Sequence, residues 1–194
     1  MARPRGFDTD WALERVTGVF WARGFERASL DDLCAATGLN RSSLYAAFGG
    51  KRDLYLRALA RYEEGSAARI AAALARRPLR AGLAAFLGAL IDSIVQGPGR
   101  RGCFIGNCAA ELARLDRGAA GRVRRSLDRI EACFRDGLEK ARARGDLPRG
   151  ADSVALARFL TASVQGLRLV GKSNPDRAAL EDVAAVMLRC VETT

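Results

Sequence analysis

The chain has 194 residues, which suits one mid-sized unit or a small module joined to a larger one. Hydrophobic residues make up 49% of the chain, so it can form a packed core and is not intrinsically disordered. The formal net charge of +10 makes a polyanion a candidate partner, although arginine-rich composition can also arise without any such partner.

The composition favours helix almost everywhere, because Ala, Leu and Arg dominate while Pro is scarce. After a short basic arm over residues 1–7, apolar residues recur at helical spacing between capping and breaking residues. Helices are expected over 9–23, 30–37, 41–48, 51–76, 79–95, 102–115, 119–144, 152–171 and 176–191. We therefore predict an all-α fold of about nine helices, with a three-helix N-terminal domain (1–50) and a larger helical domain (51–194).

The segment from Ser29 to Phe48 carries the functional prediction. Two short helices joined by a tight turn at Gly38 form a helix-turn-helix. Cys34 supplies a small side chain where the helices cross. The residues expected to pack beneath the motif are apolar and occur in the right order: Val16, Phe20, Leu33, Leu39, Leu44 and Phe48.

The run from Thr37 to Lys51 resembles the DNA-binding signature of the TetR family of bacterial repressors. It has Gly38, a polar cap, Leu44-Tyr45, an aromatic residue and then Gly-x-Lys, in the family's order. The resemblance covers about residues 10–60, and the remainder agrees only in architecture. It implies a nine-helix fold in which residues 51–194 form the ligand-binding and dimerisation domain. It also implies dimerisation through the last two helices and release from DNA when a small molecule binds.

The resemblance implies base contacts from Arg41, Ser42 and Ser43, and phosphate contacts from Tyr45 and Lys51. Short or cationic side chains early in the second helix of the motif suit base edges in a major groove. A lysine at a helix N-terminus suits a phosphate. The complete expected DNA-binding set is Ser29, Asn40, Arg41, Ser42, Ser43, Tyr45 and Lys51.

Structural alternatives exist for several of these residues. Tyr45 could be a half-buried structural aromatic, Lys51 a solvated lysine, and the two serines ordinary first-turn residues of a helix. The distribution of charge does not decide between DNA contact and a structural role. Residues 1–60 carry nine Lys and Arg against seven Asp and Glu, whereas residues 101–150 carry twelve against seven.

A single helix-turn-helix contacts too few phosphates for tight recognition, so we expect a homodimer on a palindromic DNA duplex. Apolar stripes on the last two predicted helices are the candidate interface, although they could equally be core of the same chain. The expected interface residues are Phe159, Leu160, Val164, Leu167, Val183, Val186, Met187 and Val191.

The segment from Gly102 to Leu112 resembles a Gly-Cys-apolar-apolar stretch seen in some family members, including regulators of electrophile and metal responses. Cys103, beside two arginines at a predicted helix start, is an alternative sensor of oxidants or electrophiles. It could instead be a small buried hydrophobe. The expected effector-binding residues, each of which also has a structural interpretation, are Cys103, Asn107, Glu111, Gln165 and Arg168.

The chain has no histidine, which removes histidine-based catalysis and most zinc or copper sites. No nucleophile–base pair or phosphate loop is present, so we expect no enzyme activity, metal or cofactor. The chain has five cysteines without CxxC spacing, and it has no apolar signal segment or run of 18 apolar residues. These features predict a cytoplasmic protein that does not contact a membrane.

Taken together, the sequence predicts a repressor that an unknown small-molecule effector releases from DNA. The alternative is a small-molecule-binding protein without DNA binding.

Overall fold

The computed structural model describes residues 7–112, 116–148 and 150–192, and within these residues it contains only helices, turns and loops. The predicted all-α fold is confirmed. The elements are α1 (Thr9–Arg27), α2 (Leu30–Thr37), α3 (Arg41–Phe48), α4 (Lys51–Ala75), α5 (Leu79–Gln96), the 3-10 turn η1 (Pro98–Arg101), α6 (Phe104–Glu111), α7 (Arg117–Ala143), α8 (Ser153–Ser173) and α9 (Arg177–Arg189).

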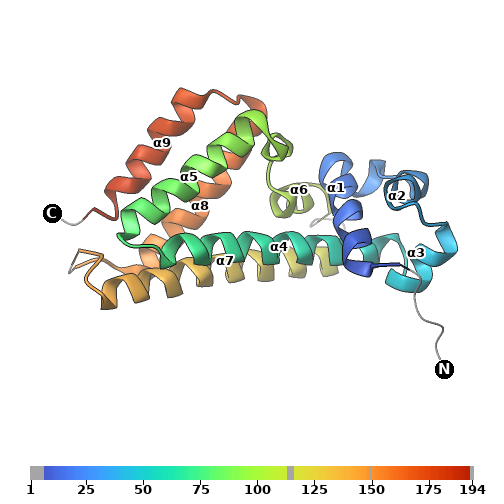
Figure 1. The fold of residues 1–194 in the computed structure, drawn as a ribbon, viewed down its shortest axis with the longest axis horizontal. Helices are drawn as coiled ribbons and strands as arrows, with labels where there is room; N and C mark the ends of the chain where they lie inside the picture. Colours follow the sequence, from blue (N-terminus) through green and yellow to red (C-terminus); the bar gives the residue numbers. More distant parts are fainter. Residues whose placement is uncertain (1–6, 113–115, 149, 193–194) are drawn as a thin grey trace.

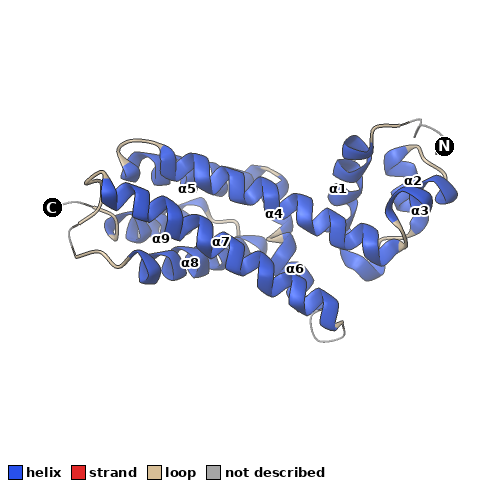
Figure 2. Cartoon of the chain, turned by 90° about the horizontal axis from the view of Figure 1, so that it is seen from below, coloured by secondary structure: helices blue, strands red, loops and turns tan. Residues whose placement is uncertain are grey.

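The molecule has two parts joined by one long helix (Figure 1). Helices α1–α3 form the reading head (residues 9–48) at one end, and α5–α9 form the body (residues 79–192). Helix α4 runs from the head along the full length of the body. Figure 2 shows the same division from a second direction, with α7 beside α4.

Helices α4 and α7 run in the same direction and are tied at both ends. At their starts, the Arg52 guanidinium donates to both carboxylate oxygens of Asp116, at 2.6 and 2.9 Å. At their ends, Arg144 donates to the backbone carbonyl of Leu74 at 2.9 Å. This pair of long helices is therefore a fixed axis that the other helices pack around.

A buried ionic network lies between these ties. Glu63 of α4 is only 2% exposed, and its carboxylate accepts hydrogen bonds from Ser126 at 2.5 Å and Arg122 at 2.8 Å. Arg129 adds a contact at 3.2 Å. A buried carboxylate needs such partners, because desolvation otherwise makes its charge costly.

The first helix differs from its predicted end at Arg23. The backbone does leave helical geometry at Gly24, where φ is 78°, but a further turn continues the helix to Arg27. The carboxylate of Glu111, on α6, accepts hydrogen bonds from the backbone N–H groups of Phe25 (3.0 Å) and Glu26 (2.9 Å). A long-range contact thus caps the restarted turn, and the local sequence gives no sign of it.

The helix predicted over 102–115 is shorter than expected. It begins at Phe104, because the preceding residues form η1 and Gly102 adopts a left-handed φ of 78°. Its last described residue in helical form is Glu111, and the predicted end at 113–115 lies outside the described residues, as does most of the basic arm. The other helix ends differ from prediction by a few residues, because the last turns of a helix fray.

Helix α5 is long and apolar enough to cross a membrane by length and composition, with a mean hydropathy of 1.4 over 18 residues. It packs against α4, α8 and α9. Two charged residues on it form ion pairs within the chain, Arg80 with Glu192 and Asp92 with Arg177. These contacts are those of a core helix in a helical bundle.

Replacing Glu63 by alanine should lower the free energy of unfolding by about 3 kcal/mol, because it leaves a buried hydroxyl and a partly buried arginine without their acceptor. Urea denaturation measures this change. The exposed neighbour Glu64→Ala is the matched control and should stay within about 0.5 kcal/mol. A loss below about 1 kcal/mol in Glu63→Ala would show that the network does not stabilise the fold.

Candidate nucleic-acid interface

Local hydrogen bonds define both helices of the helix-turn-helix. Ser29 and Asp32 form a capping box: the Asp32 N–H donates to the Ser29 hydroxyl at 3.1 Å, and the Ser29 N–H donates to the Asp32 carboxylate at 2.9 Å. Gly38 ends α2 in the left-handed region with φ 64°, where a side chain would be strained. The predicted turn is therefore present.

The apolar underside of the motif also agrees with the prediction. Helix α1 packs against α2, and the head forms a common core with the start of α4. The fully or nearly fully buried residues of the predicted set are Val16, Phe20, Leu33, Leu44 and Phe48. Cys34 and Leu39 are partly buried against them. This packing orients α3 so that its opposite face points to solvent.

The start of α3 presents short polar and cationic side chains. Arg41 and Ser42 are exposed and Ser43 is partly exposed. The Arg41 guanidinium pairs with the exposed Asp31 at 2.7 Å. Since exposed ion pairs contribute little stability, Arg41 can exchange this partner for another acceptor at small cost.

Asn40 has a structural task. Its side-chain oxygen accepts from the Ser43 N–H and from the Ser42 hydroxyl, both at 2.8 Å, and so caps α3. The Ser29 hydroxyl likewise donates to Asp32 at 2.8 Å. Both residues position the motif, whatever further contacts they make.

Tyr45 and Lys51 lie on the exposed side of the motif. The Tyr45 side chain is 37% exposed, and it follows the buried Leu44. The Lys51 ammonium lies 4.7 Å from the centre of the Phe25 ring and 3.4 Å from the Glu26 carbonyl oxygen. The N-terminus of α4 has no side-chain cap, so its first N–H groups are free to face an anion.

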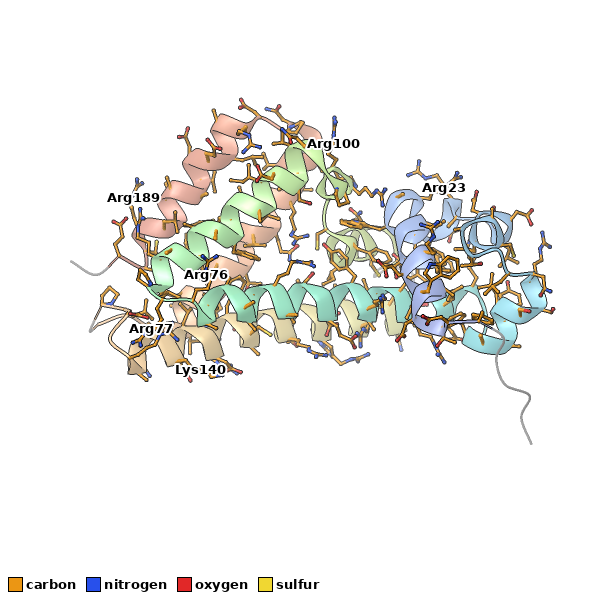
Figure 3. All side chains as sticks on the ribbon, in the orientation of Figure 1. Arg23, Arg76, Arg77, Arg100, Lys140 and Arg189 are labelled. Carbon is orange, nitrogen blue, oxygen red and sulfur yellow. The ribbon has the colours of Figure 1, made fainter. Side chains whose placement is uncertain are left out.

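Charge alone does not single out this end of the molecule. Figure 3 shows Arg23 on the head, whereas Arg76, Arg77, Lys140 and Arg189 lie at the opposite end. Arg77 is already paired with Asp146, at 3.8 Å. The candidate interface therefore depends on the shape and chemistry of α3, and not on an excess of basic residues.

Polar contacts join the head to the body. The indole N–H of Trp21 donates to the Gly102 carbonyl at 3.1 Å, and Arg101 donates to the Gly18 carbonyl at 3.4 Å. Beside them lies a chain of edge-to-face aromatic pairs from both parts, formed by Phe20, Trp21, Phe25, Tyr55, Tyr62 and Phe104. The head is thus seated on the body through α1, α6 and η1.

A cavity of about 860 Å³ opens at this junction, between α1, α4, α5, η1 and α8. Of the five expected effector-binding residues, Arg168 lines it. Cys103 and Gln165 line a small hollow of about 10 Å³ that shares Arg168 with the cavity. Trp21 and Arg69 also line the large cavity but were not predicted. No sequence pattern links them to the other lining residues, because they come from the head and from the long connecting helix.

The other two expected effector residues lie elsewhere. Asn107 donates to the Arg101 carbonyl at 2.9 Å and accepts from Lys172 at 3.0 Å. Glu111 caps the last turn of α1, which restarts after Gly24, as described above. The structure therefore does not bring these five residues together around one cavity.

The predicted dimer interface is corrected in part. Five of its residues are buried in the core of the same chain and cannot contact a second copy: Leu160, Val164, Leu167, Met187 and Val191. Phe159, Val183 and Val186 are exposed by 38%, 45% and 46%. Two large exposed apolar residues near the end of α8, Leu169 and Val170, were not in the predicted interface set. An apolar stripe alone does not reveal which side of it faces the chain's own core.

The cysteines are free, and Cys103 and Cys108 are buried. Burial raises the pKa of the Cys108 thiol. Among the described residues, no group of three or more Cys, Asp or Glu side chains could hold a metal ion.

Acid should weaken the capping box. Hydrogen bonds from the backbone and then the hydroxyl of Ser29 lower the pKa of the Asp32 carboxyl below its ordinary value of 3.8. A lowered folded-state pKa gives stabilisation that is full above the ordinary value and is lost as pH falls through the folded-state value. In Asp32→Asn, the decline of the melting temperature between about pH 5 and pH 2 should be shallower than in the parent chain. Asp182→Asn, at an exposed position on α9, is the control and should show the parent slope. An equally steep decline in Asp32→Asn would contradict the assignment.

Comparison with known proteins agrees with this geometry. Residues 14–58 match the family model described as bacterial regulatory proteins, tetR family. Residues 78–187 match the model described as tetracyclin repressor-like, C-terminal domain.

The relatives match along almost their whole length. The HTH-type transcriptional repressor ComR of Escherichia coli (strain K12) is 30% identical over 189 residues, which cover 96% of this chain and 90% of ComR. The HTH-type transcriptional regulator YezE of Bacillus subtilis (strain 168) is 32% identical, covering 99% of this chain and all of YezE. A solved complex of the regulator CifR, a cysteine mutant bound to a 26-base-pair operator duplex, is 33% identical with a TM-score of 0.81, covering 98% of this chain and all of CifR. With the helix-turn-helix, the helical body and these relatives in agreement, the chain belongs to the TetR family of DNA-binding transcriptional regulators.

Proposed function

We propose that the chain is a homodimeric, cytoplasmic repressor that binds a palindromic operator and leaves it when a small molecule occupies the cavity between head and body. The exposed polar start of α3, held outward by a capped and fully packed helix-turn-helix, carries the proposal. CifR, a relative of similar length and fold, has been solved on its operator.

The roles of individual residues follow from their positions. Arg41, Ser42 and Ser43 would reach base edges, because they occupy the exposed first turn of α3. Tyr45 and Lys51 would contact phosphates on either side of that turn, together with the free N–H groups of α4. Ser29 and Asn40 would hold the two helices in place through their caps.

The cavity gives a physical route from effector to DNA. It is lined by α1 of the head and by α4, α5 and α8 of the helices behind it, so one bound molecule would contact both parts. A ligand that binds better to one head position shifts the population toward that position. Effector binding would in this way change the spacing of two reading heads in a dimer.

Two observations bear on the alternative in which Cys103 senses an oxidant or electrophile. Cys103 is only 7% exposed, and it lines the small hollow together with Arg168 and Tyr62. A reagent that modifies this thiol would have to reach a buried position. A reversible ligand requires no such access to the thiol, and it is the function that we propose.

Selection of bound duplexes from a random pool, at about 150 mM salt, should enrich a palindrome with half-sites about 10 base pairs apart or a multiple of that distance. Tyr45→Phe and Lys51→Ala should each weaken binding to all sequences. Lys51→Ala, which removes a positive charge, should also flatten the salt dependence, whereas Arg41→Ala should change the preferred bases. Lys140→Ala, at the opposite end of the molecule, is the matched control for Lys51→Ala. Absence of enrichment, or unchanged binding in all three variants, would reject the DNA-binding assignments.

The exposed apolar residues of α8 and α9 should form the dimer. Val183→Glu together with Val186→Glu would place charges in the contact and shift the chain to monomers, because an unpaired buried charge is costly. Light scattering after size exclusion measures the mass. Ala71→Glu, at an exposed position on α4, should leave the dimer intact. A double variant that remains dimeric would place the interface on another face.

A further inference from the structure

Arg168 of α8 is an unusual residue for a helical core. It is only 9% exposed, and it donates a hydrogen bond to the hydroxyl of Tyr62. Its Nε is buried without a hydrogen-bond partner, and no carboxylate within 4 Å pairs with it in the described part of the chain. Buried guanidinium groups are normally paired with an anion, because desolvation of an unpaired charge is costly.

Tyr62 does not supply the missing negative charge. Burial raises the pKa of its hydroxyl to about 12, so the group is a neutral phenol at physiological pH. The phenol oxygen accepts one hydrogen bond from Arg168 but leaves the guanidinium charge uncompensated. Arg168 also lines the cavity, so its guanidinium group can donate to a molecule bound there.

A second cation lines the same cavity. Arg69 of α4 hydrogen-bonds only to the hydroxyl of Ser66, at 3.1 Å, among the residues that the structure describes. Desolvation, and then the nearby positive charge of Arg168, lower the pKa of Arg69. An anion bound between the two arginines would relieve the repulsion of their charges.

The acidic residues at the cavity do not cancel these charges. Glu14 pairs with Arg61, at 3.3 Å, and Glu64 is exposed. Both lie in the cavity lining together with Arg61, Arg69, Arg101 and Arg168, so the arginines outnumber the carboxylates. The cavity is electropositive in net charge.

The rest of the lining is apolar and aromatic. Trp21 of the head, with Phe86 and Leu90 of α5, faces the space. A volume of about 860 Å³ falls in the range of about 300–1,000 Å³ typical of small-molecule sites. Apolar walls with a few fixed charges select a ligand that has an apolar body and one charged group.

We propose that this cavity binds an organic anion, whose carboxylate or phosphate group is held by Arg168 and Arg69 and whose apolar body packs against Trp21 and Phe86. Planar guanidinium groups suit both kinds of acid group, since each can donate two parallel hydrogen bonds. The anion would be the effector, a role that rests on the proposed function. Because Trp21 belongs to the reading head and Arg168 to the body, the ligand would bridge the two parts.

Binding can be tested without DNA through the fluorescence of Trp21. The chain has two tryptophans, and Trp11→Phe leaves Trp21 as the only one. We would titrate this variant with 4-nitrobenzoate, 4-nitrophenyl phosphate and the neutral 4-nitrobenzamide, whose nitroaromatic rings quench indole emission. At least one anion should quench saturably with an affinity about tenfold or more above that of the amide, and the preferred anion identifies carboxylate or phosphate as the acid group.

Arg168→Met in the Trp11→Phe background should weaken binding of that anion about ten- to a hundredfold and leave the amide unchanged. Arg100→Met, on η1 outside the cavity lining, is the matched control and should bind like the parent. If Arg168→Met fails to fold by circular dichroism, the exposed Arg69→Met takes its place, with a smaller expected loss. Lack of saturable quenching by both anions, equal affinity for anion and amide, or unchanged binding in both arginine variants would overturn the proposal.

A second arm tests the effector role with the selected operator. The saturating anion should reduce operator affinity of the parent chain and leave that of Arg168→Met unchanged. Binding of the anion without any change in operator affinity would overturn the effector role alone. Failure to select an operator would reject the proposed function, while the fluorescence titration would still decide the chemistry of the cavity.

Discussion

The buried carboxylate of Glu63 constrains the molecule most strongly. It lies in the middle of α4, and hydrogen bonds from Ser126 and two arginines of α7 stabilise its negative charge. The requirement to satisfy this charge fixes both the rotation and the sliding of α4 against α7. Since α4 also forms part of the core of the reading head, the position of the head follows from a contact made deep in the other part of the chain.

The helix-turn-helix could be predicted from the sequence because its determinants are local. Ser29 and Asn40 cap helices that begin at the next residue, and Gly38 supplies the one left-handed position that the turn needs. Such signals act within four or five residues, so a sequence displays them directly. The number and the approximate ends of the remaining helices followed from apolar periodicity in the same way.

The rest depended on contacts between residues far apart in the chain. Glu111 resembled a ligand-binding residue on an apolar helix, yet its partners are backbone groups of α1, 85 and 86 positions away. Leu160 and Met187 belong to apolar stripes that periodicity detects, but periodicity does not distinguish the chain's own core from a surface for a second copy. The cavity was not predictable for the same reason, because five elements contribute to its wall.

The cap that Glu111 places on α1 has a consequence for the thermodynamics of operator binding. With the Trp21 and Arg101 contacts, it fastens the head at three separate points, so the head is not a freely hinged module. In the proposed dimer, most of the orientational entropy of the two heads would therefore be lost on folding and not on meeting DNA. Tight binding then becomes possible with few base contacts, and a rotation of one head against its body would prevent both heads from meeting their half-sites together.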